Sequence, residues 1–199
     1  ETPAFQHGTR AVDRDISQAH LCMAFPGPKL GVQQRYACDM VSSVLGGGST
    51  SRLFERIREN EGLAYSIYTF NSYHSMAGML GVSAIVAPQN LGRTLELTYE
   101  ALRDVRDALV DENELDMNRE QLKGGMLMSL ESTSSRMSRM AKSMMFYGRI
   151  IPLEEVIHNI DAVTQAHVQA FAEETFTLNN CAVLVLGPTG GHNVEAVAL

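Results

Sequence analysis

The sequence contains no uninterrupted apolar run that approaches the ~20 residues needed to cross a bilayer. Its first ten residues, ETPAFQHGTR, lack the charged and apolar regions of a signal peptide. They also lack an initiator methionine, as we expect of a processed or cloned fragment. We therefore expect no membrane partner, and this end of the chain does not identify a compartment.

Basic residues are also in the minority. The chain carries 16 Lys and Arg against 23 Asp and Glu, which gives a formal net charge of −7 at pH 7. Nucleic acids and anionic membranes are bound through basic surfaces, so this balance argues against both as partners.

Cysteine is scarce. Cys22, Cys38 and Cys181 stand far apart, their number is odd, and no C-x-x-C motif occurs. Each lies in an apolar context, which predicts buried, reduced thiols and fits a reducing compartment.

The remaining composition is that of an ordinary globular protein. With 199 residues, 45% of them hydrophobic and 20% charged, the chain can bury a full core. No linker rich in Pro, Gly or Ser interrupts it, and no repeat of useful length is present. We therefore expect a single domain over residues 1–199.

Four segments predict strands. Residues 18–25 (QAHLCMAF) form the first, which stops at Pro-Gly-Pro. Residues 64–73 and 78–86 predict an antiparallel pair, and residues 181–187 (CAVLVLG) predict the last strand.

Apolar residues at helical spacing predict the helices. The expected helices cover about 31–45, the segment around Leu53 to Arg58, and then 91–109, 112–130, 133–147 and 164–175. Ser49 or Thr50 can cap the second helix, Gly62 suits the left-handed position after it, and the serines of 132–135 can cap a later one. This order of elements predicts an α+β fold, a largely antiparallel sheet with helices packed on one face.

The sequence offers no convincing metal site. None of its six histidines forms H-x-x-E-H. Glu154 and Glu155 precede His158 at helical spacing, but a bundle metal site of that kind needs a second such motif. We interpret that segment as an exposed helix face, and HNVE at 192–195 as part of a frayed tail.

The methionines allow two interpretations. Met137, Met140 and Met144 fall on one helical face. Thioethers bind Cu(I), but methionine more often fills irregular space between helices, so we expect core packing here.

No nucleophile motif is present. GGGSTSR at 46–52 matches neither G-x-S-x-G nor the phosphate-binding G-x-x-x-x-G-K-[ST]. A helix N-terminus there could hold an anion, but capping is the favoured interpretation. Physical reasoning from the residues alone ends at an α+β domain without a catalytic site of its own.

Two longer segments carry a resemblance. LGGGSTSRLFERIRENEGLAYSIYTF (45–70) and SLESTSSRMSRMA (129–141) resemble the C-terminal half of M16-type zinc metallopeptidases, such as the mitochondrial processing peptidase and bacterial processing proteases. The resemblance implies two related α+β halves that face each other across a chamber. The first half carries H-x-x-E-H and a distal Glu, which bind zinc. This sequence has none of these, so it resembles the half without metal, which is inactive alone.

In that family an Arg and a Tyr of the second half reach the bound peptide. Arg58 and Tyr65 match this pair in type, spacing and motif, so the resemblance implies that they donate to a substrate carbonyl as it becomes an oxyanion. The alternative is that Arg58 pairs with a nearby glutamate (Glu55, Glu59 or Glu61) while Tyr65 packs in the sheet. Strand alternation places Tyr73 on the Tyr65 face, where it could also contact substrate.

By the same alternation, Ile67 shares the Tyr65 face, and Tyr68 and Phe70 occupy the other, where we expect them to be core. The Gly-Gly-Gly run at 46–48 is too short for the glycine-rich loop of the processing peptidase, and we interpret it as a turn between helices.

The sequence therefore leaves two candidate functions. The favoured one is the C-terminal half of a zinc endopeptidase that takes extended peptides into a chamber. Its partner would be a zinc-bearing N-terminal half on the same or another chain, within a homo- or hetero-dimer. The alternative is a non-catalytic partner or structural subunit of such an assembly. The bacterial cytoplasm is the expected compartment, and the periplasm and the mitochondrial matrix are the alternatives.

Overall fold

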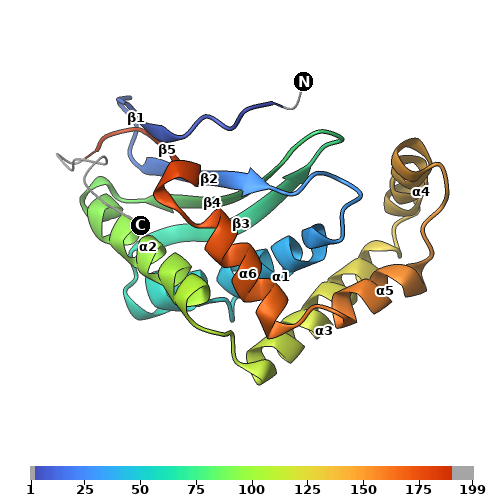
Figure 1. Cartoon of the computed structure of the whole chain (residues 1–199). Helices are drawn as coiled ribbons and strands as arrows, with labels where there is room; N and C mark the ends of the chain where they lie inside the picture. The colour runs from blue at the N-terminus through green and yellow to red at the C-terminus, as the bar shows by residue number, and fades with distance from the viewer. Residues whose placement is uncertain (1–2, 190–199) are drawn as a thin grey trace.

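A computed structural model describes residues 3–189 as a twisted sheet with helices packed on one face, and this confirms the predicted α+β class (Figure 1). The strand order across the sheet is β1-β5-β2-β4-β3. The strands are β1 (Gly8–Val12), β2 (Ala19–Gly27), β3 (Ala64–Tyr73), β4 (Gly78–Val86) and β5 (Ala182–Leu186). All neighbours pair antiparallel except β1 and β5, which are parallel. The tail segment 192–195 lies outside the described residues.

Strand β1 was not predicted from the sequence. It is five residues long, mostly exposed, and pairs with β5 at the far end of the chain. A short edge strand of this kind has no strong alternation of apolar residues, and its partner is distant in sequence. Only the folded sheet therefore defines it.

The helices divide into a layer and an arm. Helices α1 (Gln34–Gly46), α2 (Leu91–Asp107) and α6 (Gln165–Thr175) lie under the sheet, and α3 (Glu112–Ser129), α4 (Thr133–Tyr147) and α5 (Leu153–Asp161) extend to one side (Figure 1). Short 3₁₀ turns stand at Pro88–Asn90 and Leu178–Asn180. Helix α5 contains Glu154, Glu155 and His158, the segment interpreted from the sequence as an exposed helix face, although its bounds were not predicted.

The core lies between the sheet and the helix layer. On β2, every second residue from Ala19 to Phe25 is buried. The Phe25 ring meets Phe176, which follows α6, edge to face with a centroid distance of 5.0 Å. Helix α2 is buried at the predicted spacing up to Val105, but it ends at Asp107. Leu109, expected on the same face, is therefore exposed.

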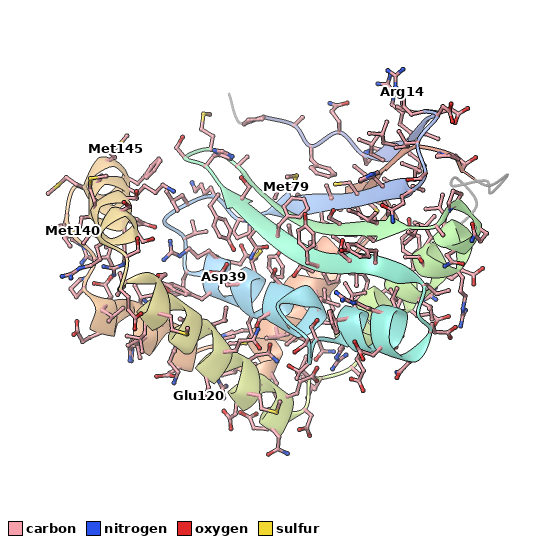
Figure 2. All side chains as sticks on the ribbon, turned by 180° about the vertical axis from the view of Figure 1, so that it is seen from behind. Arg14, Asp39, Met79, Glu120, Met140 and Met145 are labelled. Carbon is pink, nitrogen blue, oxygen red and sulfur yellow. The ribbon has the colours of Figure 1, made fainter. Side chains whose placement is uncertain are left out.

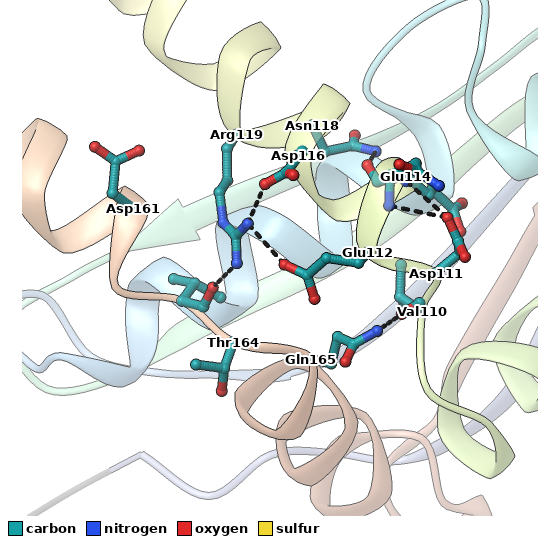
Figure 3. Close-up of polar contacts among 12 residues, drawn as sticks. Val110, Asp111, Glu112, Glu114, Asp116, Asn118, Arg119, Asp161, Thr164 and Gln165 are labelled. Carbon is teal, nitrogen blue, oxygen red and sulfur yellow. Dashed lines mark hydrogen bonds and ion pairs between the residues drawn. The ribbon is translucent and has the colours of Figure 1, made fainter.

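Polar contacts around Arg119 on α3 hold the arm together and join it to the turn before α6 (Figure 3). Arg119 donates to the Val163 carbonyl at 2.6 Å and to Glu112 at 3.1 Å, and it also pairs with Asp116. Nearby, Lys123 pairs with Asp161 of α5 at 2.7 Å. These contacts connect α3 to α5 and to the turn that precedes α6.

The predicted methionine packing is wrong for α4. Met137, Met140 and Met144 are all exposed, as are their neighbours Met128 and Met145. Figure 2 shows Met140 and Met145 projecting from α4, which stands apart from the sheet. The helical face predicted for packing exists, but no element in residues 3–189 covers it.

The structure confirms some of the predicted helix caps and glycine conformations and not others. Ser132 accepts from the Ser135 backbone N–H at 3.3 Å, as predicted for the start of α4. Gly62 has a φ of +62°, the left-handed conformation expected of it. The predicted cap at Ser49 or Thr50 is absent from the described hydrogen bonds; Ser51 instead donates to the Gly48 carbonyl at 2.6 Å.

Within residues 3–189, no helix combines the length and apolarity that a bilayer span requires.

Candidate functional site

Arg58 lies on a π-helix, not on the ordinary α-helical turn that its sequence predicts. The π-helical segment, η1, runs from Phe54 to Asn60. Leu53 and Ile57 anchor it in the core, whereas Arg58 is exposed. The wider i→i+5 turn is rare, and π-turns are frequent at functional sites. After η1, Leu63 donates to the Ile57 carbonyl at 2.9 Å and leads the chain into β3.

The Arg58 guanidinium has no carboxylate partner among the described residues. Its Cζ lies 4.8 Å from the centroid of the Phe54 ring, one turn earlier, in cation–π contact. The alternative drawn from the sequence, an ion pair with a neighbouring glutamate, is therefore wrong. Glu61 instead pairs with Arg93 at 3.5 Å. A stacked guanidinium keeps its N–H groups available for an acceptor.

Tyr65 occupies a β-bulge. Ala64 pairs with Val86 and Ser66 pairs with Ile85, so Tyr65 is an extra residue in β3. Its side chain is 75% exposed, although Ala64 before it and Ile67 after it are buried. A bulge re-aims one side chain and reverses the alternation beyond it. Tyr65 and Ile67 therefore do not share a face, contrary to the sequence prediction.

The bulge also explains why Tyr73 does not lie with Tyr65. The Tyr73 hydroxyl donates to Asp39 Oδ1 of α1 at 2.6 Å, and Asn71 Nδ2 donates to the same oxygen at 2.9 Å. Figure 2 labels Asp39 on α1, close beneath the sheet. Burial and the Asp39 carboxylate raise the pKa of the Tyr73 phenol far above its usual range. Tyr73 therefore joins β3 to the helix layer, and it is not aimed at the surface that carries Tyr65.

Tyr68 and Phe70, predicted as core, lie on the open face of the sheet. Tyr68 is 48% exposed, and its ring centroid is 6.5 Å from that of Phe70. Phe70 packs over its cross-strand neighbour Gly81, where an added Cβ would come within 2.3 Å of the ring. No helix of the described chain covers this face, so β3 presents its aromatic residues outward.

The thiols are free, as predicted, and poorly suited to catalysis. Burial raises the pKa of Cys38 to about 12 and that of Cys181 to about 11. Cys22, on the open face, is only partly buried, which corrects the expectation that all three are buried. Among residues 3–189, no group of three His, Cys, Asp or Glu side chains could hold a metal ion.

The candidate site therefore lies where η1 leads into β3. Arg58 of η1 stacks on Phe54, Tyr65 stands on the bulge of β3, and both side chains are exposed. The chain belongs to the family of peptidase M16 inactive domains, whose model matches residues 2–122. This agrees with the resemblance drawn from residues 45–70 and 129–141.

Curated relatives extend the similarity over most of the chain. It is 34% identical over 190 residues to the uncharacterized zinc protease YmxG of Bacillus subtilis, covering 96% of this chain and 46% of that protein. It is 35% identical over 179 residues to the uncharacterized zinc protease Rv2782c of Mycobacterium tuberculosis, covering 90% and 41%. The chain thus spans less than half the length of each of these relatives.

Solved structures share the fold. The peptidase M16 inactive domain from Pseudomonas fluorescens matches with a TM-score of 0.82 at 22% identity, covering 95% of this chain and 46% of that chain. A chain of Complex III2 from Candida albicans matches with a TM-score of 0.81 at 15% identity, covering 92% and 46%. At these identities the likeness concerns architecture alone.

Proposed function

We propose that this chain is the substrate-binding half of a zinc-dependent endopeptidase, and that Arg58 and Tyr65 donate hydrogen bonds to the bound peptide. The observation that carries the proposal is the state of the two side chains: Arg58 has no carboxylate partner in the described residues, and Tyr65 is raised on a bulge. Because no acceptor within the described residues takes up their donor groups, both side chains are able to donate to a ligand.

The chemistry follows from the donors. A guanidinium fork and a phenol both donate to an oxygen that gains negative charge, as the peptide carbonyl does during hydrolysis. Both groups are held by backbone features, a π-turn and a bulge, so little ordering is needed when substrate binds. The two groups would orient the peptide and stabilise the oxyanion.

The metal belongs elsewhere in this proposal. Residues 3–189 contain no cluster of metal-ligating side chains, so this part of the chain offers no zinc site. The curated relatives named as zinc proteases are more than twice as long as the matched part. We therefore place zinc in a second half, on the same or a partner chain, where it would activate water.

A non-catalytic partner subunit is the alternative function. The observation that favours it is the uncovered face of the sheet, where Tyr68, Leu184 and Leu186 are exposed. Exposed apolar surface of this kind marks contacts with other proteins. The exposed donors of Arg58 and Tyr65 are the reason to favour the substrate-binding function over this one.

Replacement of Tyr65 with Phe in the full-length protein tests the proposal. Loss of one oxyanion donor lowers kcat by about 10²-fold or more, with little change in melting temperature. Tyr68→Phe is the matched control, because Tyr68 is an exposed tyrosine three residues further along β3. Equal kcat for the two variants would contradict a role for Tyr65, and a full-length protein with no peptidase activity would favour the alternative.

A further inference from the structure

A large cleft separates α4 from the main body of the domain. Its volume is about 810 Å³, and its walls come from α1, the end of β3, α4 and the start of α5. Figure 1 shows α4 at the end of the arm, standing apart from the sheet. The size is within the range of ligand-binding clefts in proteins, and the cleft is distinct from the Arg58 and Tyr65 surface at the other end of β3.

The cleft is lined by positive charge. Arg35, Arg139 and Lys142 contribute to its walls, together with hydroxyls such as those of Ser135 and Ser138. Among the residues that the structure describes, no Asp or Glu side chain lines it. In a chain whose net charge is −7, this makes the cleft a local site of opposite sign.

The cations are held by neutral groups. Arg35 Nη1 donates to the Tyr147 hydroxyl at 2.9 Å, and Arg139 Nη2 donates to the Ile151 carbonyl at 2.8 Å. These contacts fix the guanidinium groups without neutralising them. No ion pair within residues 3–189 involves Lys142, which is exposed on α4.

Within the described residues, Asp39 is a carboxylate that acts on the Arg35 side of this wall. It lies beneath Arg35 and interacts with it electrostatically. Its Oδ1 already accepts hydrogen bonds from Tyr73 and Asn71. Asp39 thus balances part of the Arg35 charge, and the charges of Arg139 and Lys142 remain for a ligand.

We propose that this cleft binds a carboxylate group of the peptide substrate. The inference rests on the proposed function and adds a preference for acidic peptides to it. A carboxylate accepts charge-assisted hydrogen bonds from Arg and Lys, and serine hydroxyls satisfy its remaining lone pairs. The carboxylate comes from an acidic side chain or from the peptide C-terminus.

The length of β3 sets the distance between the cleft and the peptide bond that Arg58 and Tyr65 would face. Tyr65 begins β3, and the residues around Tyr73 at its other end line the cleft. At about 3.3 Å per residue, the roughly eight residues between them span about 26 Å. An extended peptide that runs beside β3 rises by the same amount. Its carboxylate therefore lies about eight residues from the bond that Arg58 and Tyr65 face.

Calorimetric titration of the 199-residue chain tests the cleft without any cleavage. The ligand is a ten-residue peptide with three aspartates, compared with the same peptide carrying asparagines. We expect the acidic peptide to bind about tenfold tighter at low salt and to lose this advantage near 1 M salt, where charges are screened beyond about 3 Å. Equal binding of the two peptides, together with no loss of binding when the C-terminus is amidated, would overturn the proposal. An amidated C-terminus distinguishes terminal from side-chain carboxylates, since only terminal recognition is lost on amidation.

Charge reversal on α4 locates the binding. Lys142→Glu should weaken acidic peptide binding by about tenfold or more, because it replaces attraction with repulsion. Arg136→Glu is the matched control, since Arg136 lies on α4 but does not line the cleft. Equal effects of the two substitutions would overturn the assignment to this cleft, and Lys142→Gln provides a milder variant if the first unfolds. If acidic and neutral peptides bind equally well but Tyr65→Phe still lowers kcat, this inference is rejected and the proposed function is retained.

Discussion

Tyr73 donates a hydrogen bond of 2.6 Å to Oδ1 of Asp39, and this contact joins the end of β3 to helix α1. Tyr73→Phe removes it and leaves a partly buried carboxylate with one donor fewer. We expect the free energy of unfolding to fall by about 1–3 kcal/mol, the cost of an unmade buried hydrogen bond. Urea denaturation measures this. Tyr65→Phe should leave stability unchanged, and equal losses in the two variants would contradict the distinction between them.

The pH dependence of stability should report on Asp39. Burial raises the pKa of its carboxyl, and the hydrogen bonds from Tyr73 and Asn71 only partly oppose this. A raised folded-state pKa contributes stability that is fully present below the unfolded value of about 3.9 and is lost as pH rises through the folded value. Asp39→Asn removes this titration.

Denaturation of both proteins between pH 4 and pH 7 checks the sign. The free energy of unfolding of the native protein, relative to Asp39→Asn, should decrease as pH rises over this interval. A difference that increases with pH would mean that the hydrogen bonds outweigh burial, and that the folded-state pKa of Asp39 is lowered.

The methionines should divide into two classes under mild oxidation. Met145 is 78% exposed and Met128 is 72% exposed, whereas Met23 and Met40 are fully buried. Sulfoxide formation follows exposure, so peptide mass spectrometry after brief peroxide treatment should find the first two oxidised and the last two intact. Protection of Met145 in the full-length protein, compared with this chain alone, would locate a surface of α4 that another part covers.

The sequence predicted the hairpin well. Residues 64–73 and 78–86 match β3 and β4, because alternating apolar residues and a turn between them are local signals. The π-helix and the bulge were not predicted, since both depend on how η1 and β3 pack against their neighbours. That one extra residue reversed the strand alternation, and it is why Tyr73 was assigned to the wrong face.

The candidate site was only partly predictable. Arg58 and Tyr65 were named through a resemblance, and the structure adds that both are exposed and that Arg58 stacks on Phe54 with no carboxylate partner among the described residues. The cationic cleft drew no attention in the sequence, because Arg35 on α1 is far along the chain from Arg139 and Lys142 on α4. These residues line one cleft only because the folded chain places α4 beside α1 and the end of β3.

The most direct test of the account is the value of kcat/KM for peptide cleavage by the full-length protein with Arg58→Ala. The account predicts a fall of about 10²- to 10³-fold with an almost unchanged melting temperature, because a transition-state donor is lost from an exposed position. Arg56→Ala is the control, since Arg56 lies on the same π-helix but pairs with Asp104 at 2.7 Å, a surface contact worth about 0–1 kcal/mol. Activity of Arg58→Ala equal to that of Arg56→Ala would contradict the proposal that this half supplies Arg58 to the substrate.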